Sequence, residues 1–230
     1  MSRNGLVEGG RESFSLRLCG PRFHGTITRR RKAIGRSLRM YTRPVKIRLA
    51  ATLLCACWWI AECIRSSIRD KPRTENRDRR SSTLWDLAHI VCVAGIIAGF
   101  THIGRVRDRG QLIAICGIVL MLVGIFFRWT AIQTLGVYFS GKVNVFEGQH
   151  IVRTGVYQHV RHPAYAGSLL AYLGMGLAFA NWISFFLIFF PVLLAALYRI
   201  RVEERGLKEA FGDEYDDYSR STKRFVPGIY

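Results

Sequence analysis

Five stretches of the chain are almost purely apolar, and polar or basic segments separate most of them. A spanning helix needs about 17–25 residues, and flanking Trp, Tyr and Arg side chains extend the reach of a shorter stretch to the membrane interface. The fifth stretch, WISFFLIFFPVLLAALY, has no polar face, which disfavours a soluble helical bundle. The pattern predicts an all-α integral membrane protein with about five transmembrane helices. They are expected at Leu49–Ile64, Leu84–Ile103, Leu112–Phe127, Tyr165–Ala180 and Trp182–Tyr198.

The order of these stretches brings two distant polar regions to one side of the membrane. The fourth and fifth stretches meet at Asn181, which predicts a tight helical hairpin. The loop Thr130–Pro163 and the tail Arg199–Tyr230 flank this hairpin, so both must lie on the same side. Five spans place the basic loop at 65–83 there as well. Its excess of Lys and Arg favours the cytoplasmic side.

The charge of the chain is strongly positive and unevenly distributed. There are 34 Lys and Arg against 16 Asp and Glu, a formal net charge of +18. The excess lies in residues 1–48 and 65–80, beside apolar stretches and without interleaved aromatic side chains. That arrangement favours contact with anionic membrane lipid over nucleic-acid binding.

The first 44 residues are polar and aperiodic, so residues 1–44 are expected to be a basic, disordered N-terminal segment. Five spans would place this segment opposite the cytoplasmic side, against the charge rule. Three explanations stay open: the first apolar stretch is not a span, the rule fails here, or translation starts at Met40.

Polar side chains crowd the boundary before the fourth apolar stretch, in GVYQHVRHPAYAG at Gly155–Gly167. Gly155 marks a turn, and Pro163 suits the first turn of the fourth helix. The residues just before it then lie at an electropositive helix N-terminus, a place suited to anionic groups. Such density is unusual for a plain connector. The side chains concerned are Tyr157, His159, Arg161, His162 and Tyr165.

The tail begins with two opposite charges on one helical face. Arg199 and Glu203 are four residues apart, near a membrane boundary where unpaired charges cost several kcal/mol. The simplest structural interpretation is a salt bridge between them, which would contribute about 0.3–0.5 kcal/mol to stability. The fifth helix is expected to continue through Arg199–Tyr218 and to pack back on the body through an apolar stripe. That stripe consists of Leu207, Phe211, Tyr215 and Tyr218.

Taken together, the two polar regions resemble the isoprenylcysteine carboxyl methyltransferase family and, more broadly, the related phospholipid methyltransferases. The resemblance covers about residues 127–230 and depends on the order of its pieces. These are Gly155-x-Tyr157, Arg161-His162-Pro163-x-Tyr165-x-Gly167, Glu203-Glu204, Phe211-Gly212-x-x-Tyr215 and Arg224-x-x-Pro227. It implies N-terminal transmembrane helices at 45–126 and a catalytic region at 127–230.

The resemblance also implies S-adenosyl-L-methionine as cofactor, bound without a Rossmann sheet. In agreement, no strand–turn–helix glycine motif is present in the sequence. The family often has His where this chain has Gln149, and Lys142 is a weaker candidate for the cofactor side. Arg199 matches the arginine that binds the substrate carboxylate. The implied cofactor-binding residues are Gln149, His150, Ile151, Val152, Tyr157, His162, Pro163, Ala164, Tyr165 and Glu203.

The reaction expected from this resemblance is carboxyl O-methylation of an isoprenylcysteine-like acceptor. A carboxylate is ionised near pH 7, so neither a general base nor a metal is expected. A prenylated or other lipophilic acceptor would enter from the bilayer, and the cofactor would enter from the cytoplasm. A phospholipid amine or thiol acceptor stays open, as does a non-catalytic membrane scaffold.

Overall fold

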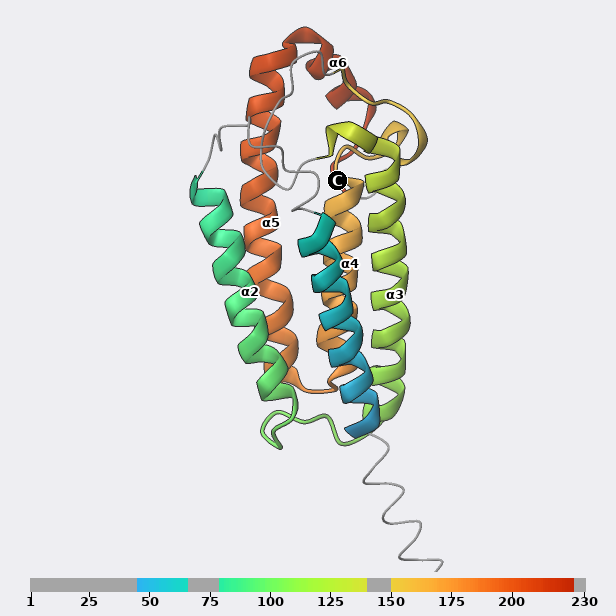
Figure 1. The fold of residues 1–230 in the computed structure, drawn as a ribbon, viewed down its shortest axis with the longest axis vertical. Helices are drawn as coiled ribbons and strands as arrows, with labels where there is room; N and C mark the ends of the chain where they lie inside the picture. The colour runs from blue at the N-terminus through green and yellow to red at the C-terminus, as the bar shows by residue number, and fades with distance from the viewer. Residues whose placement is uncertain (1–44, 66–78, 140–149, 226–230) are drawn as a thin grey trace, which may run out of the picture. The chain divides into compact units, whose positions relative to one another are not determined.

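The computed structural model describes residues 45–65, 79–139 and 150–225, and these form helices joined by short loops (Figure 1). Across these ranges there is no strand, only two isolated bridges. The all-α prediction is confirmed. The expected disorder of residues 1–44 lies outside the described residues. The helices are Val45–Arg65, α2 (Arg79–Gly99), α3 (Gly110–Leu135), η1 (Gly136–Tyr138), η2 (Gly155–Gln158), α4 (Pro163–Ala178), α5 (Trp182–Phe211) and α6 (Asp213–Ser221).

Four of these helices are long and apolar enough to cross a bilayer: the first helix, α2 from Arg80, α3 and α5. Each carries large apolar side chains on its outer surface, as a lipid-facing helix requires. Leu53, Ile90, Phe126 and Leu194, one from each helix, are about two thirds exposed. The fourth predicted stretch corresponds to α4, which has only 16 residues, and most of its side chains are buried. The chain is an integral membrane protein in which α4 is an inner helix.

Helices α3 and α4 pack backbone against backbone along a seam of glycines. A Cβ atom at Gly117 or Gly124 of α3, or at Gly167 or Gly174 of α4, would lie closer than 3.0 Å to the backbone of the other helix. Only glycine permits this approach, which small residues commonly provide between membrane helices. Gly167, the glycine of the RHPxYxG motif, is thus a packing residue.

The helical hairpin forms at Asn181, as predicted. Its side-chain Oδ1 accepts a hydrogen bond from the Ser184 amide at 3.1 Å, which caps α5. Its Nδ2 donates to the carbonyl oxygens of Ile103 at 2.8 Å and Ala98 at 3.3 Å. One side chain therefore starts α5 and fastens the α2–α3 connection beside it.

The tail departs from the predicted single helix. Helix α5 ends at Phe211, and Gly212 adopts a φ of 53°, a left-handed value that glycine accepts at little cost. The chain then turns into α6, which lies at the end of the bundle where α4 begins (Figure 1). The prediction of one unbroken helix through Tyr218 was wrong. The predicted packing is nevertheless present, because Tyr215 and Tyr218 are each 5% exposed.

Candidate active site

The hydroxyl of Tyr165 joins the two charged residues that the sequence places on one face of α5. The Arg199 Nε donates to the Tyr165 hydroxyl oxygen at 3.0 Å. The same hydroxyl is hydrogen-bonded to the Glu203 carboxylate, which accepts from it. Pro163 at the first position of α4, as predicted, places Tyr165 in the first turn of that helix. Tyr165 of α4 and the pair Arg199 and Glu203 of α5 thus form one polar unit, although 34 residues separate Tyr165 from Arg199.

One carboxylate oxygen of Glu203 lacks a partner in the described part of the chain. Its Oε2 is buried and has no hydrogen-bond partner among the residues that the structure describes. A buried acceptor left in this way costs about 1–3 kcal/mol, and more when it is charged. The arrangement is therefore suited to a ligand that brings a positive charge or a hydrogen-bond donor to this oxygen.

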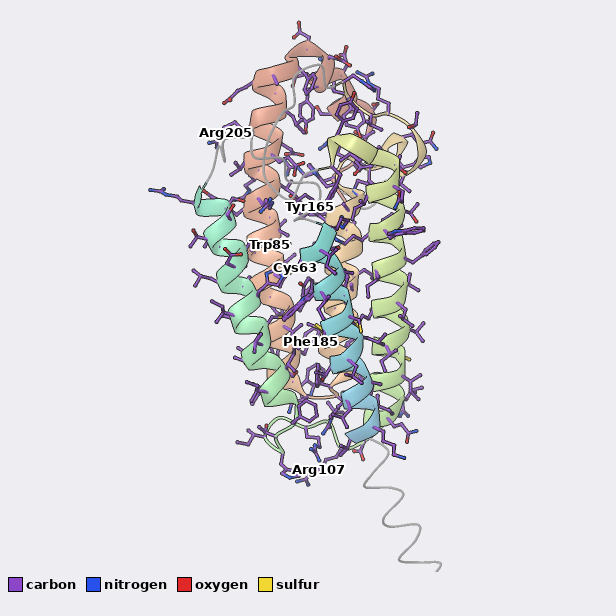
Figure 2. The ribbon with its side chains drawn as sticks, viewed as in Figure 1. Cys63, Trp85, Arg107, Tyr165, Phe185 and Arg205 are labelled. Atoms are coloured by element: carbon purple, nitrogen blue, oxygen red, sulfur yellow. The ribbon has the colours of Figure 1, made fainter. Side chains whose placement is uncertain are left out.

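Trp85 of α2 contacts this polar unit; Figure 2 labels Trp85 and Tyr165. The Arg199 guanidinium carbon lies 5.7 Å from the centre of a Trp85 ring, a cation–π distance. The Tyr165 ring meets Trp85 edge to face with centroids 6.4 Å apart. Arg199 is only 6% exposed, so its charge lies in a low-dielectric setting where electrostatic interactions are strong. Trp85 is a site residue that the sequence motifs did not predict.

A second glutamate, Glu204, links the residues just before α4 to the chain that follows α6. Its Oε1 lies 3.3 Å from His162 Nε2 and 3.3 Å from Arg161 Nε. Arg224 grips the same carboxylate bidentately, with Nε to Oε1 at 3.1 Å and Nη2 to Oε2 at 2.7 Å. His162 itself is 4% exposed and its ring lies 5.9 Å from that of Tyr165. Glu204 is therefore held by protein side chains and has a structural role.

Backbone hydrogen bonds reinforce this fastening. The Arg161 amide donates to the Lys223 carbonyl at 2.7 Å, and the His162 amide donates to the Arg224 carbonyl at 3.1 Å. In return, the Lys223 amide donates to the His159 carbonyl at 3.3 Å. The residues just before α4 are thus held by the chain that follows α6, which fixes where His162 and Tyr165 can lie.

Tyr157 is as much a core residue as a candidate ligand contact. It is 7% exposed and packs with Ala131, Ile132 and Ala164. Its carbonyl oxygen accepts a hydrogen bond from the Tyr218 hydroxyl at 2.8 Å. Burial raises the pKa of the Tyr157 phenol and raises the pKa of Tyr218 to about 12, so both stay protonated at physiological pH. A role for Tyr157 in cofactor binding stays a prediction.

The other predicted residues are distributed around this centre. Ile151 and Val152 are half-buried, and Val152 packs against the core that contains Tyr157 and Ala164. His150 is exposed, with its Nδ1 3.2 Å from the Tyr138 hydroxyl. Gln149, Lys142 and Pro227 lie outside the described residues. The structure therefore brings together His162, Tyr165, Arg199 and Glu203.

An ion pair that was not predicted from the sequence contacts the first turns of α4. Arg128 of α3 donates to both oxygens of Glu62 on the first helix, Nε to Oε1 at 2.8 Å and Nη2 to Oε2 at 3.1 Å. Its Nη1 donates to Ser168 Oγ at 2.8 Å and to the Ala164 carbonyl at 3.2 Å. Both charged residues lie within helices that are apolar enough to span a membrane, where ionisable residues are rare and usually paired. Their position in apolar stretches was therefore the sequence signal that could have predicted this ion pair.

Comparisons with known proteins find similarity to methyltransferases. A sequence model of the family described as "Phospholipid methyltransferase" matches residues 112–214. Protein-S-isoprenylcysteine O-methyltransferase B of Arabidopsis thaliana is 35% identical over 149 residues, which are 63% of this chain and 74% of that protein. The protein-S-isoprenylcysteine O-methyltransferase of Saccharomyces cerevisiae is 35% identical over 121 residues, which are 52% of this chain and 51% of that protein. The chain thus spans about half the length of the yeast relative.

The fold is similar to that of a solved membrane enzyme. The structure described as the eukaryotic intramembrane Ras methyltransferase, isoprenylcysteine carboxyl methyltransferase without a monobody, matches with a TM-score of 0.61. The match has 20% sequence identity and covers 81% of this chain and 68% of that chain. At that identity the likeness concerns the fold, and it supports the helical arrangement described above.

Proposed function

The chain belongs to the isoprenylcysteine carboxyl methyltransferase family of membrane methyltransferases, and from this premise we propose its reaction. We propose that it transfers the methyl group of S-adenosylmethionine to the carboxylate of a lipophilic, isoprenylcysteine-like acceptor. The single observation that carries this proposal is the buried unit in which Tyr165 joins Arg199 to Glu203, whose Oε2 has no partner among the described side chains. One cation and one anion, held a helical turn apart, are suited to an anionic acceptor and a cationic donor.

The cofactor side of the site is Glu203. When bound, S-adenosylmethionine supplies a methyl group on a positively charged sulfonium and also carries an ammonium group. The buried Glu203 Oε2 fits such a charge, because a charge-assisted hydrogen bond would satisfy it. The motif residues and the loop before them would hold the adenosyl portion. These are His150, Ile151, Val152, Tyr157, His162, Pro163, Ala164 and Tyr165, together with Gln149.

The acceptor side is Arg199. A guanidinium holds a carboxylate in a fixed plane, and here Tyr165 and Trp85 hold the guanidinium itself. An ionised carboxylate needs no base, so the work of the protein is to align the acceptor and to exclude water. Burial of Arg199 serves both tasks, because it strengthens the ion pair with the acceptor and keeps solvent away.

The proposed location of this site is the cytoplasmic end of the bundle. The support is the basic segment at 65–80, which topology assigns to the same side as the tail. The apolar helices around the site suit an acceptor that arrives from the bilayer. A phospholipid amine is the second candidate acceptor, since the matching family model is described as "Phospholipid methyltransferase".

Methyl transfer to matched acceptors tests the proposal. Purified protein is given methyl-labelled S-adenosylmethionine and one of three acceptors: an S-prenylated cysteine with a free carboxylate, its carboxamide, or phosphatidylethanolamine. We expect label only in the free carboxylate. Arg199→Gln should lower that transfer about 10- to 100-fold, the loss of a charged hydrogen bond, while exposed Arg201→Gln should not. Labelling of phosphatidylethanolamine that is insensitive to Arg199→Gln would favour the amine acceptor instead.

A further inference from the structure

We propose that a basic pocket between the end of α5, α6 and the tail binds a phosphate-bearing anion. The cavity has a volume of about 330 Å³. That is near the lower limit of small-molecule sites, which span about 300–1,000 Å³, so it suits a phosphate ester or a lipid headgroup better than a large cofactor. Its lining consists of Arg161, Glu204, Arg205, Lys208, Tyr215, Ser219 and Arg224.

The charge of the lining is positive after its internal pairs are counted. Four cations face one carboxylate, Glu204, which Arg161 and Arg224 already share. Lys208 is paired with Asp216 at 3.0 Å on the surface, where such a pair contributes little. Arg205 lines the pocket and is exposed. Guanidinium and ammonium groups gathered in this way are typical of sites for phosphate.

A buried hydroxyl independently indicates a ligand. Tyr215 lines the cavity, is 5% exposed, and its hydroxyl has no hydrogen-bond partner within the described ranges. Leaving a buried hydroxyl unsatisfied is costly in the free protein. Burial raises the pKa of the Tyr215 phenol, so the hydroxyl stays protonated and can donate to a ligand oxygen. A phosphate oxygen in the cavity would satisfy it.

The pocket is distinct from the proposed methyl-transfer site. Glu203, Arg199 and Tyr165 are not among its lining residues. Lys208 follows Glu203 by five residues, which is about 140° around an α-helix at 100° per residue. The two sites therefore use different faces of α5, and Glu204 lies between them. A ligand in this pocket is not the methyl donor in its proposed position.

Phosphate-dependent thermal unfolding of the full chain in detergent tests the proposal. Inorganic phosphate is titrated at constant ionic strength against four proteins: wild type, Arg205→Gln, Tyr215→Phe and the control Arg107→Gln. Arg107 lies at the opposite end of the bundle and undergoes the same chemical change as Arg205 (Figure 2). We expect wild type and Arg107→Gln to bind phosphate alike. Arg205→Gln should bind about tenfold more weakly, and Tyr215→Phe about three- to tenfold.

Tyr215→Phe separates a binding role from a structural one. Without phosphate it should unfold no earlier than wild type, because it removes an unsatisfied hydroxyl and keeps the ring. With phosphate it should gain less than wild type. The proposal is overturned if phosphate raises no unfolding midpoint, or raises all four equally.

Nanodiscs distinguish the source of the phosphate. If the ligand is a lipid headgroup, phosphatidic acid in phosphatidylcholine discs raises the midpoint of wild type, and inorganic phosphate adds nothing further in those discs because the lipid already fills the pocket. If the ligand is soluble, inorganic phosphate acts in pure phosphatidylcholine discs and phosphatidic acid does not. Either result supports the pocket when Arg205→Gln weakens the effect about tenfold and Arg107→Gln does not. These assays involve no methyl transfer, so failure here leaves the proposed reaction standing.

Discussion

Replacing Gly167 by alanine should separate α3 from α4, although alanine favours helices in general. A Cβ atom at Gly167 would lie 2.5 Å from the Arg128 amide nitrogen and 2.8 Å from the Gly124 carbonyl oxygen. Both obstacles are backbone atoms, so no side-chain rotation can relieve the overlap. Ordinary contact begins at 3.4 Å, so the helices must move apart by about 1 Å.

Overpacking of this kind costs about 1–3 kcal/mol, and the helix propensity of alanine returns at most about 1 kcal/mol. We expect a net loss of about 2 kcal/mol, because the overlap involves rigid partners on both sides. For a chain of this size that lowers the unfolding midpoint by about 4–8 °C. Gly206→Ala is the matched control, since no atom of the described residues lies within 4 Å of a Cβ atom there. It should raise the midpoint by up to about 4 °C.

The assay is thermal unfolding in detergent of wild type, Gly167→Ala and Gly206→Ala. The same shift of α4 should displace Tyr165, which lies two residues before Gly167, and weaken ligand binding at Glu203. A Gly167→Ala protein as stable as Gly206→Ala would refute the reasoning, because the same atom would then have the same effect in the seam and on an open helix face.

Two further substitutions probe the supports of the fold. Asn181→Ala removes the α5 cap on Ser184 and two bonds to the α2–α3 connection, so calorimetric unfolding should show a loss of about 1–2 kcal/mol; an unchanged midpoint would contradict the capping role. Glu62→Gln leaves the Arg128 charge poorly compensated inside the bundle and should cost about 1–3 kcal/mol in denaturant unfolding, less than for a fully buried pair because Glu62 is 26% exposed. Exposed Asp217→Asn, which loses only a surface pair, is the control and should change little.

Much of the helical arrangement could be predicted because apolar length and turn residues act locally. Pro163 begins α4 and Asn181 divides α4 from α5, as expected from their local chemistry. The motif order also brought His162, Tyr165, Arg199 and Glu203 to the same end. They lie at the start of α4 or in the second half of α5, and the α4–α5 hairpin brings these two helix ends to one side of the bundle.

The missed features depend on pairings between distant segments. The partner of Glu204 at Arg224 follows from the turn at Gly212, and a glycine in a polar helical run does not reveal whether the helix continues. Trp85 reaches Arg199 only through the packing of α2 on α5. Its position in an apolar stretch looks the same as that of any interfacial tryptophan. Helix packing, rather than helix formation, is what the sequence pattern left undetermined.

Calorimetric binding of S-adenosylhomocysteine tests the central claim most directly, because this product keeps the ammonium group of the donor. Wild type, Glu203→Gln and the exposed control Glu209→Gln are compared in detergent. We predict that wild type and Glu209→Gln bind alike, and that Glu203→Gln binds about 10- to 100-fold more weakly through loss of a charged hydrogen bond. Equal affinity in Glu203→Gln, or no binding by folded wild type, would contradict the assignment of Glu203 to the methyl donor.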